Sequence, residues 1–157
     1  MFAYEDKTPH WVNRLSFVLR TEVQRRFKAA GYDLTAEEWA MLMLLWGREP
    51  RSVSDIAASS LRERTTVTRL LDGMVAKGLV ERRPGADDAR RVDVGLTEAA
   101  RALQAPLVGL VEEMIGQATA GLTRDEVAVA NKVLRTMTEN LVEAAGGAAS
   151  RPAKRKV

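Results

Sequence analysis

Hydrophobic residues recur at intervals of three and four along most of this chain, which is the spacing of one face of an α-helix. The first stripe follows a proline that suits a first helical turn, and it predicts a helix from Pro9 to about Ala30. The next apolar run, from Ala36 to about Gly47, is hydrophobic on all sides and predicts a central buried helix. Residues 35–38 have the sequence of a capping box, which marks where that helix begins.

Two more helices are predicted after Pro50. A short one begins at Ser52 and ends at about Ser60. In the next, which Gly78 stops, one side is apolar through Val67, Leu70, Leu71, Met74 and Val75. At 100° per residue, the opposite face carries Arg62, Thr65 and Arg69, flanked by Thr66 and Thr68. Arginine and threonine on one narrow helix face suit the major groove of DNA, so this is the expected recognition helix.

Residues 79–97 predict a β-hairpin. Leu79 to Arg83 forms the first strand, and residues 92–96 alternate apolar and polar side chains in the second. Gly95 weakens a strand interior, so the second strand is expected to be short or bent. The loop at 84–91 is polar and carries arginines. A helix with a polar face, followed by a hairpin with a basic tip, predicts a winged helix-turn-helix.

Two long helices complete the pattern. Thr97 caps a helix that begins at Glu98, and Pro106 inside it predicts a kink, because proline removes a backbone donor and clashes with the preceding turn. Residues 123–126 form a second capping box. The last helix, which Gly146-Gly147 ends, has an apolar side formed by Val127, Ala130, Leu134, Met137 and Leu141.

The predicted fold is mainly α with a small β-hairpin wing, a winged helix-turn-helix flanked by N- and C-terminal dimerisation helices. We expect one domain over residues 9–147, with the winged helix-turn-helix at about 35–97 and the outer helices at about 9–30 and 98–146. Residues 1–8 are expected to be flexible, and 148–157 to form a basic disordered tail. A winged helix cannot cover the apolar stripes of the outer helices, so a second copy is expected to do so in a homodimer.

The net charge of +3 hides a local concentration of basic residues. Arg151, Lys154, Arg155 and Lys156 contribute +4, so the rest of the chain sums to about −1. From Leu61 to Arg91, by contrast, eight Arg or Lys residues stand against five Asp or Glu. A DNA-binding surface needs such a local patch rather than a basic average.

Composition excludes several classes of site. There is no cysteine and a single histidine, His10, so disulfides, thiolate metal sites and thiol redox switches are excluded and a metal is not expected. The common nucleophile arrangements and a Gly-rich phosphate loop are also missing, so we expect neither an enzyme nor a cofactor. No segment has the length of a membrane span or the pattern of an export signal, which predicts a cytoplasmic protein.

Three motifs in these elements resemble the MarR family of bacterial transcriptional regulators. Residues 65–72 and 77–82 are similar to that family's recognition helix and first wing strand. The pattern D-x-R-x-x-x-V-x-L-T follows, met by Asp88, Arg90, Val94, Leu96 and Thr97. The resemblance extends over roughly residues 10–145. It implies a homodimeric regulator, most simply a repressor, that binds double-stranded DNA at a pseudo-palindromic operator.

The resemblance and the polar helix face together select the candidate DNA contacts. The recognition helix is expected to enter the major groove, and Arg90 or its neighbour Arg91 to reach the minor groove from the wing. Asp88 is expected to shape the wing turn and to pair with a nearby arginine to orient it. The full candidate set is Arg62, Arg64, Thr65, Thr66, Thr68, Arg69, Arg82, Arg90 and Arg91.

The resemblance also implies a small aromatic or anionic effector, because many members of that family release DNA when such a compound binds between the winged domain and the dimer helices. By position, Trp11, Arg14, Trp39 and Met43 are candidates to line its site, although core packing explains all but Arg14 equally well. The alternative function is a winged-helix protein–protein interaction module without specific DNA readout, since fold alone does not decide function. Such a module would have no need of an arginine-bearing groove face beside a basic wing.

Overall fold

The computed structural model describes residues 3–85, 88 and 90–145 of the chain. Several predicted features lie outside these residues. They are the basic tail at 148–157, the Gly146-Gly147 helix end, part of the wing tip, and the first two residues of the expected flexible N-terminus.

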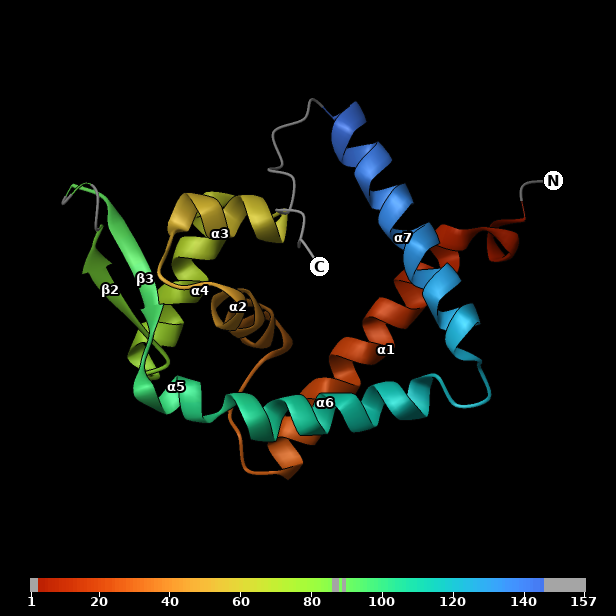
Figure 1. The fold of residues 1–157 in the computed structure, drawn as a ribbon, viewed down its shortest axis with the longest axis horizontal. Helices are drawn as coiled ribbons and strands as arrows, with labels where there is room; N and C mark the ends of the chain where they lie inside the picture. Colours follow the sequence, from red (N-terminus) through yellow and green to blue (C-terminus); the bar gives the residue numbers. More distant parts are fainter. Residues whose placement is uncertain (1–2, 86–87, 89, 146–157) are drawn as a thin grey trace.

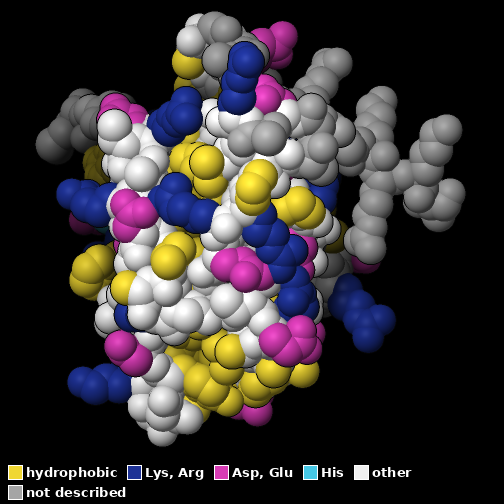
Figure 2. Space-filling view, turned by 90° about the vertical axis from the view of Figure 1, so that its left-hand side faces the viewer, with side chains coloured by type: hydrophobic (Ala, Val, Ile, Leu, Met, Phe, Trp, Pro, Cys, Tyr) yellow, Lys and Arg dark blue, Asp and Glu magenta, His cyan; other side chains and the backbone are white. Residues whose placement is uncertain are grey.

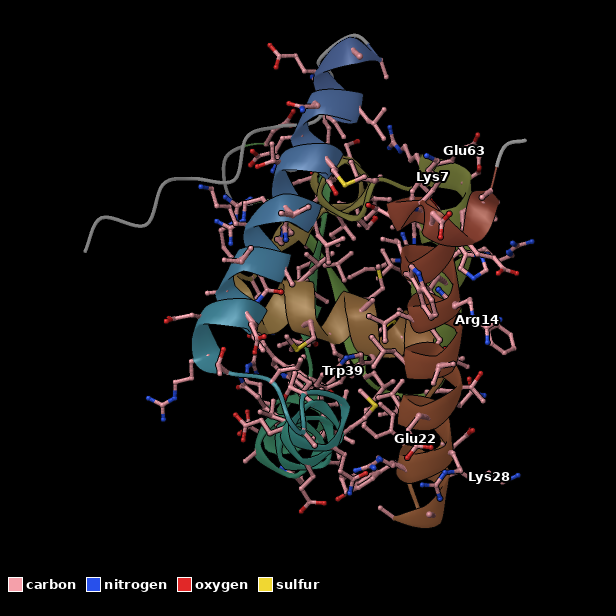
Figure 3. The ribbon with its side chains drawn as sticks, turned by 90° about the vertical axis from the view of Figure 1, so that its right-hand side faces the viewer. Lys7, Arg14, Glu22, Lys28, Trp39 and Glu63 are labelled. Carbon is pink, nitrogen blue, oxygen red and sulfur yellow. The ribbon has the colours of Figure 1, made fainter. Side chains whose placement is uncertain are left out.

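The chain forms a winged head, with longer helices extending from it (Figure 1). The head contains α2 (Ala36–Gly47), β1 (Arg51–Ser52), α3 (Val53–Ser60), α4 (Arg64–Ala76), β2 (Val80–Pro84), β3 (Val92–Leu96) and α5 (Glu98–Ala102). The remainder contains a 3-10 turn, η1 (Tyr4–Asp6), followed by α1 (Thr8–Ala29), α6 (Gln104–Ala118) and α7 (Arg124–Ala144). Seen from the end away from the wing, α1 and α7 lie apart, on either side of the structure (Figure 3). No helix of the described residues is long and apolar enough to cross a membrane.

Local sequence signals set the helix ends where they were predicted. Thr35 and Thr123 each form a complete capping box with the glutamate three residues later, in which each side chain accepts a hydrogen bond from the other residue's backbone N–H. Gly31 and Gly78 follow α1 and α4 with φ of +86° and +69°. This left-handed conformation is the one that glycine adopts without a steric penalty, so both residues end their helices as expected.

The wing contains a third strand that the sequence pattern did not indicate. β1 pairs antiparallel with β3, which also pairs with β2, so the strand order is β1-β3-β2. The predicted alternation in β3 is wrong at three positions, because Val92 is exposed whereas Asp93, which is 6% exposed, and Gly95 are buried. Asp93 lies opposite Ser52 of β1 and Arg83 of β2 in the ladder. Pairing on both sides therefore buries a polar residue that one hairpin would leave in water.

The helix predicted to start at Glu98 is interrupted rather than only kinked. α5 ends at Ala102, and α6 begins at Gln104 after the single residue Leu103. Pro106 lies in the first turn of α6, where its missing N–H is tolerated. Its ring clashes with the carbonyl four residues earlier, that of Ala102, and so prevents α5 from continuing.

One hydrophobic core joins the winged head to α1 and α6. Its fully buried side chains come from α2, α3, α4 and the sheet, with Phe27 from α1, Ala100 from α5 and Leu107 from α6. The first half of α1 contributes nothing to this core, and Trp11 there is 62% exposed. Among the described residues α7 has no buried side chain, and Leu141 is 71% exposed. The apolar stripes of both terminal helices therefore have little cover within one subunit.

Glu49, between α2 and β1, ties the base of the wing to α5. Its carboxylate accepts hydrogen bonds from the Leu96 N–H at 2.5 Å and from Arg101 Nε at 2.8 Å. Burial opposes ionisation of this carboxyl, but the two donors outweigh burial and lower its pKa. Gly95 lies beside this carboxylate, since an added Cβ would lie 3.4 Å from Glu49 Oε2. The strand expected to be short or bent at Gly95 is a regular strand of five residues.

Replacing Glu49 with glutamine should make stability less dependent on pH. Charged hydrogen bonds are stronger than neutral ones, so at neutral pH Glu49→Gln should lose about 1 kcal/mol of unfolding free energy. Folding lowers the pKa of Glu49, so wild type has the larger free energy of unfolding at any pH above the ordinary carboxyl pKa of 4.5. This difference from Glu49→Gln is lost as the pH falls through the pKa of Glu49 in the folded protein. Urea unfolding between about pH 7 and pH 3 measures this difference.

Glu98→Gln is the matched control for this experiment. Its carboxylate also meets Arg101, at 3.3 Å, but it is exposed to solvent. Removing its charge should change stability little at any pH, because exposed ion pairs are weak. A deficit of Glu49→Gln that stays constant as the pH falls would contradict the assignment of Glu49.

Candidate nucleic-acid interface

The exposed side of α4 carries two rows of polar side chains, each with a spacing of four residues. One row is Thr65 and Arg69, both exposed. The other is Arg64, Thr68 and Asp72, and it faces the wing. The three buried residues of α4 lie on the opposite side and fix this orientation. They are Val67, Leu71 and Met74.

Three residues of α4 depart from the predicted pattern. Val75, expected in the apolar stripe, is exposed near the end of the helix. Thr66 and Thr68, expected to flank the polar face, are both half-buried. The polar face predicted from the sequence is therefore correct in its centre and too wide at its edge.

The N-terminus of α4 is open. Its N-cap residue, Glu63, makes no side-chain capping bond, whereas Ser or Thr hydroxyls cap α2, α3, α5 and α7. The first N–H groups of an uncapped helix have no helical partner, and the helix dipole favours an anion beside them. Arg64, the first residue of α4, adds a guanidinium at the same place. This end of the helix is suited to bind a phosphate.

A hollow of about 590 Å³ lies between α4 and the wing. Arg64 and Thr68 line it from α4, and residues 52–54 line it from the start of α3. The wing supplies the remaining wall with Arg82, Arg90, Arg91 and Val92. Four arginines and no acidic residue thus stand among its described lining residues. Figure 2 shows Lys and Arg side chains gathered over this end of the molecule, with acidic side chains between them.

Asp88 holds the wing tip through the backbone. Its side chain accepts a hydrogen bond from the Arg90 N–H, and its carbonyl accepts one from the Arg91 N–H, both at 2.9 Å. The expected pairing of Asp88 with an arginine side chain is therefore replaced by a bond to the main chain, which sets the direction of the chain at Arg90. Gly85 allows this turn, because an added Cβ would lie 2.8 Å from the Asp88 carbonyl oxygen.

The arginines around the hollow fall into two electrostatic classes. Arg82 pairs with Asp72 of α4, and Arg91 pairs with Asp93 at 3.2 Å. Three others make no ion pair with any residue that the structure describes: Arg64, Arg69 and Arg90. An unpaired guanidinium can bind a phosphate or a base edge without first leaving an internal partner.

Arg62 does not lie on the recognition helix, contrary to the prediction. It precedes the N-cap Glu63, in the turn between α3 and α4. There it lines a second hollow of about 350 Å³, together with Leu61 and Val142 of α7. The helical pattern was extended too far because the N–H groups of Leu61 and Arg62 bond back to carbonyls of α3 and end that helix.

Two ion-pair networks hold α3 and α4 in place, and no sequence pattern indicated them. The buried Arg51 donates to Asp55 at 2.7 Å, and Asp55 also accepts from Arg48. The bond from Arg51, then the one from Arg48, lowers the pKa of the Asp55 carboxyl against the effect of its burial. Lys77, just after α4, donates at 3.1 Å to Glu38, the capping glutamate of α2. Each network joins separate elements, which local spacing cannot reveal.

The four candidate effector residues do not gather at one place within the subunit. Trp39 packs against Phe27 and Trp46, with ring centroids 5.3 Å and 5.6 Å away. Phe27 lies about 24 Å further along α1 than Trp11, at 1.5 Å per residue, and Arg14 is about one turn from Trp11. Met43 is exposed on α2. Within the described residues, no group of three His, Asp or Glu side chains could hold a metal ion.

The arrangement of helices, wing and basic hollow defines a winged helix-turn-helix protein. A model of the MarR family matches residues 34–92. The HTH-type transcriptional repressor IacR of Pseudomonas putida is 26% identical over 140 residues, which are 89% of this chain and 83% of the relative. The match to the MarR family model thus covers the chain from the segment before α2 to the first residue of β3, and the similarity to the relative extends over most of the chain.

Two solved structures have the same fold. Bordetella bronchiseptica BpsR, whose DNA binding is regulated by 6-hydroxynicotinic acid, superposes with a TM-score of 0.78 at 22% identity, covering 88% of this chain and 97% of that one. The transcriptional repressor CouR, bound to a 23-mer DNA duplex, gives 0.76 at 21% identity, covering 88% and 99%. At these sequence identities, the similarity to the two solved structures shows a shared fold and nothing more.

Leu61 occupies a backbone position that normally suits glycine. Its φ of +54° is left-handed, and its N–H and that of Arg62 close the end of α3 just as Gly78 and Leu79 close α4. Since a left-handed side chain costs about 1–2 kcal/mol and glycine adds some unfolded-state entropy, Leu61→Gly should raise the free energy of unfolding by up to about 1 kcal/mol. Thermal unfolding measures the change.

Ser60→Gly is the control for this variant. Ser60 is the last residue of α3 and has a helical backbone, so glycine there should lower stability by about 0.5–1 kcal/mol. A Leu61→Gly protein that is less stable than wild type would show that the exposed leucine side chain contributes more than its backbone conformation costs.

Proposed function

We propose that this chain is a sequence-specific DNA-binding transcriptional regulator, acting as a homodimeric repressor on a pseudo-palindromic operator. One observation carries the proposal. Unpaired arginines stand on the exposed side of α4 and at the wing tip, on either side of an arginine-lined hollow. This distribution has the chemistry of a surface that meets two grooves and the phosphates between them.

The order of α4, hollow and wing across the surface suits a single docking geometry. With α4 in the major groove, Thr65 and Arg69 meet base edges, where a guanidinium can bind guanine O6 and N7. The wing then lies at the adjacent minor groove, within reach of Arg90 and Arg91. The sugar–phosphate strand that separates the two grooves crosses the hollow, where Arg64 and Arg82 face it. Thr66, Thr68 and Arg62 lie at the edge of this contact, where phosphates rather than bases are accessible.

The terminal helices supply the dimer. The apolar side of α7 and the first half of α1 have little cover in one subunit, and an exposed stripe with helical spacing is satisfied by another helix. A two-fold pair of heads then presents two recognition helices to two half-sites, which explains a pseudo-palindromic operator. Since the bound DNA of a bacterium lies in the cytoplasm, the protein acts there.

An effector fits this arrangement better at a subunit junction than inside one subunit. Trp11 and Arg14 lie far along α1 from Phe27, against which Trp39 packs, so Trp11, Arg14 and Trp39 can line one site only if the partner subunit completes it. BpsR, which has the same fold, is regulated by 6-hydroxynicotinic acid, an aromatic and anionic compound of the class expected here. Without cysteine, a peroxide-driven disulfide cannot be the signal.

The alternative, a protein–protein module, has less support. An interaction surface is enriched in aromatic residues at its centre. The exposed side of α4 instead carries threonine, arginine and one aspartate. A regulator has no need of a catalytic group or a cofactor, so none is assigned.

Two substitutions separate base reading from phosphate binding. Arg69→Ala should cost about 1–3 kcal/mol on the operator and relax the preference at one base position in each half-site. Arg90→Ala should weaken operator and unrelated duplex more evenly, and should flatten the salt dependence by roughly one unit of slope for each phosphate that Arg90 neutralises in wild type. Binding affinities at several salt concentrations, on both duplexes, measure these effects.

Arg124→Ala is a control for both variants, because Arg124 starts α7 and lies outside the proposed interface. It removes the same charge and should leave the specificity unchanged. Operator binding by Arg69→Ala and Arg90→Ala that equals wild type would exclude α4 and the wing as the DNA-reading surface, and the proposed function with them.

Substitutions on α7 test the dimer. Leu141 is exposed and Leu134 half-exposed in one subunit, yet both lie on the apolar side proposed to face the partner. Leu134→Asp or Leu141→Asp should therefore place a charge in an apolar seam, at a cost of several kcal/mol, and disrupt assembly together with the fold that depends on it. Sedimentation equilibrium at micromolar concentration measures the assembly.

Thr136→Asp is the matched control, because its side chain lies on the opposite side of α7 and is exposed. It should remain a dimer. A wild-type protein that sediments as a compact, folded monomer at high concentration would rule out the proposed assembly.

A further inference from the structure

α4 contains a single acidic residue, Asp72. It ends the row that begins with Arg64 and Thr68, so it lies on the side of the helix that faces the wing and the hollow. Its side chain is 62% exposed. A carboxylate at this position repels phosphate, which is unfavourable for a surface whose only task is to bind DNA tightly.

Asp72 forms an ion pair with Arg82 of the wing. Arg82 of β2 donates from its guanidinium to the Asp72 carboxylate, and the same arginine lines the hollow. Arg64, Arg90 and Arg91 line the hollow as well, so Arg82 is surrounded by like charges in the free protein. Asp72 offsets their repulsion and holds the Arg82 guanidinium toward the helix.

We propose that Asp72 is a specificity-determining residue, which keeps Arg82 from binding phosphates on unrelated sequences. The proposal rests on the DNA-binding function proposed above. Non-specific binding is almost wholly electrostatic, so it is weakened both by the Asp72 charge and by the occupied Arg82. On the operator, base contacts from Thr65 and Arg69 seat α4 deeply enough to offset the separation of the pair. The released carboxylate can then accept a hydrogen bond from cytosine N4.

A second carboxylate–arginine pair in the same strand provides a matched comparison. Glu81 pairs with Arg83, and side chains alternate along β2, so this pair lies on the face opposite Arg82. Arg83 accordingly lies near Gly95 and Glu49 rather than at the hollow. Glu81→Gln and Asp72→Asn each remove one negative charge and each free one arginine. Arg82, which Asp72→Asn frees, faces the hollow, whereas Arg83, which Glu81→Gln frees, lies on the other face of the strand.

The test compares wild type, Asp72→Asn, Arg82→Gln, the double variant and Glu81→Gln on operator and on unrelated duplex at several salt concentrations. Asp72→Asn should raise the affinity for unrelated duplex about two- to fivefold and steepen its salt dependence by about 0.9 for each additional phosphate that is neutralised. Its operator affinity should change less, so its specificity ratio falls. In the Arg82→Gln background the same substitution should have no such effect, and Glu81→Gln should match wild type. Asp72→Glu, which retains the charge, should keep the wild-type ratio.

Three results would overturn the inference. In the first, Asp72→Asn binds both duplexes more weakly and unfolds at a lower temperature, as loss of a merely structural pair would cause. In the second, its effect persists without Arg82 or is reproduced by Glu81→Gln. In either case wild type still discriminates the operator, so the proposed function stands. In the third, wild type binds both duplexes equally or not at all, which overturns the proposed function together with this inference.

Discussion

The rotation of α4 about its own axis decides what this protein presents to its surroundings. Val67, Leu71 and Met74 are fully buried beneath the helix, and their removal from water fixes which side faces out. Because the helix period is 3.6 residues, that choice also places Thr65 and Arg69 on the outer side. The capping carboxylate of Glu38, bound to Lys77, anchors the far end of α4 and leaves its uncapped N-terminus exposed.

Charge is divided unequally over the exposed surface. Arg64, Arg69 and Arg90 are unpaired among the described residues, whereas carboxylates hold Arg82, Arg83 and Arg91. Unpaired cations bind any phosphate, so affinity alone is simple to obtain. Discrimination between DNA sequences requires contacts that form only on the correct sequence. A carboxylate that holds one of the arginines makes DNA binding depend more strongly on those contacts.

The sequence predicts the elements of this fold because their signals are local. Capping boxes at Thr35 and Thr123 and the glycine at Gly78 act within a few residues, and each lies where it was expected. The errors concern contacts between distant residues. β1 is too short to show a period, Asp93 is buried by two neighbouring strands, and Lys77 lies 39 residues along the chain from its partner Glu38. Arg62 continues a helical pattern that the left-handed Leu61 interrupts. Of the candidate site, the polar row of α4 and the arginine wall of the hollow were predictable, but the pairing of Arg82 with Asp72 was not.

Selection of the duplexes that the protein binds from a random-sequence library tests most directly whether the winged heads of a homodimer recognise two symmetric half-sites. The wild-type protein should enrich a pseudo-palindrome whose half-site centres lie about 10–10.5 base pairs apart, or a multiple of that spacing. Methylation of guanine N7 in each half-site should then reduce binding, because that atom faces the major groove. Enrichment of no common sequence, or of a single unrepeated half-site, would contradict a homodimer that reads DNA through α4.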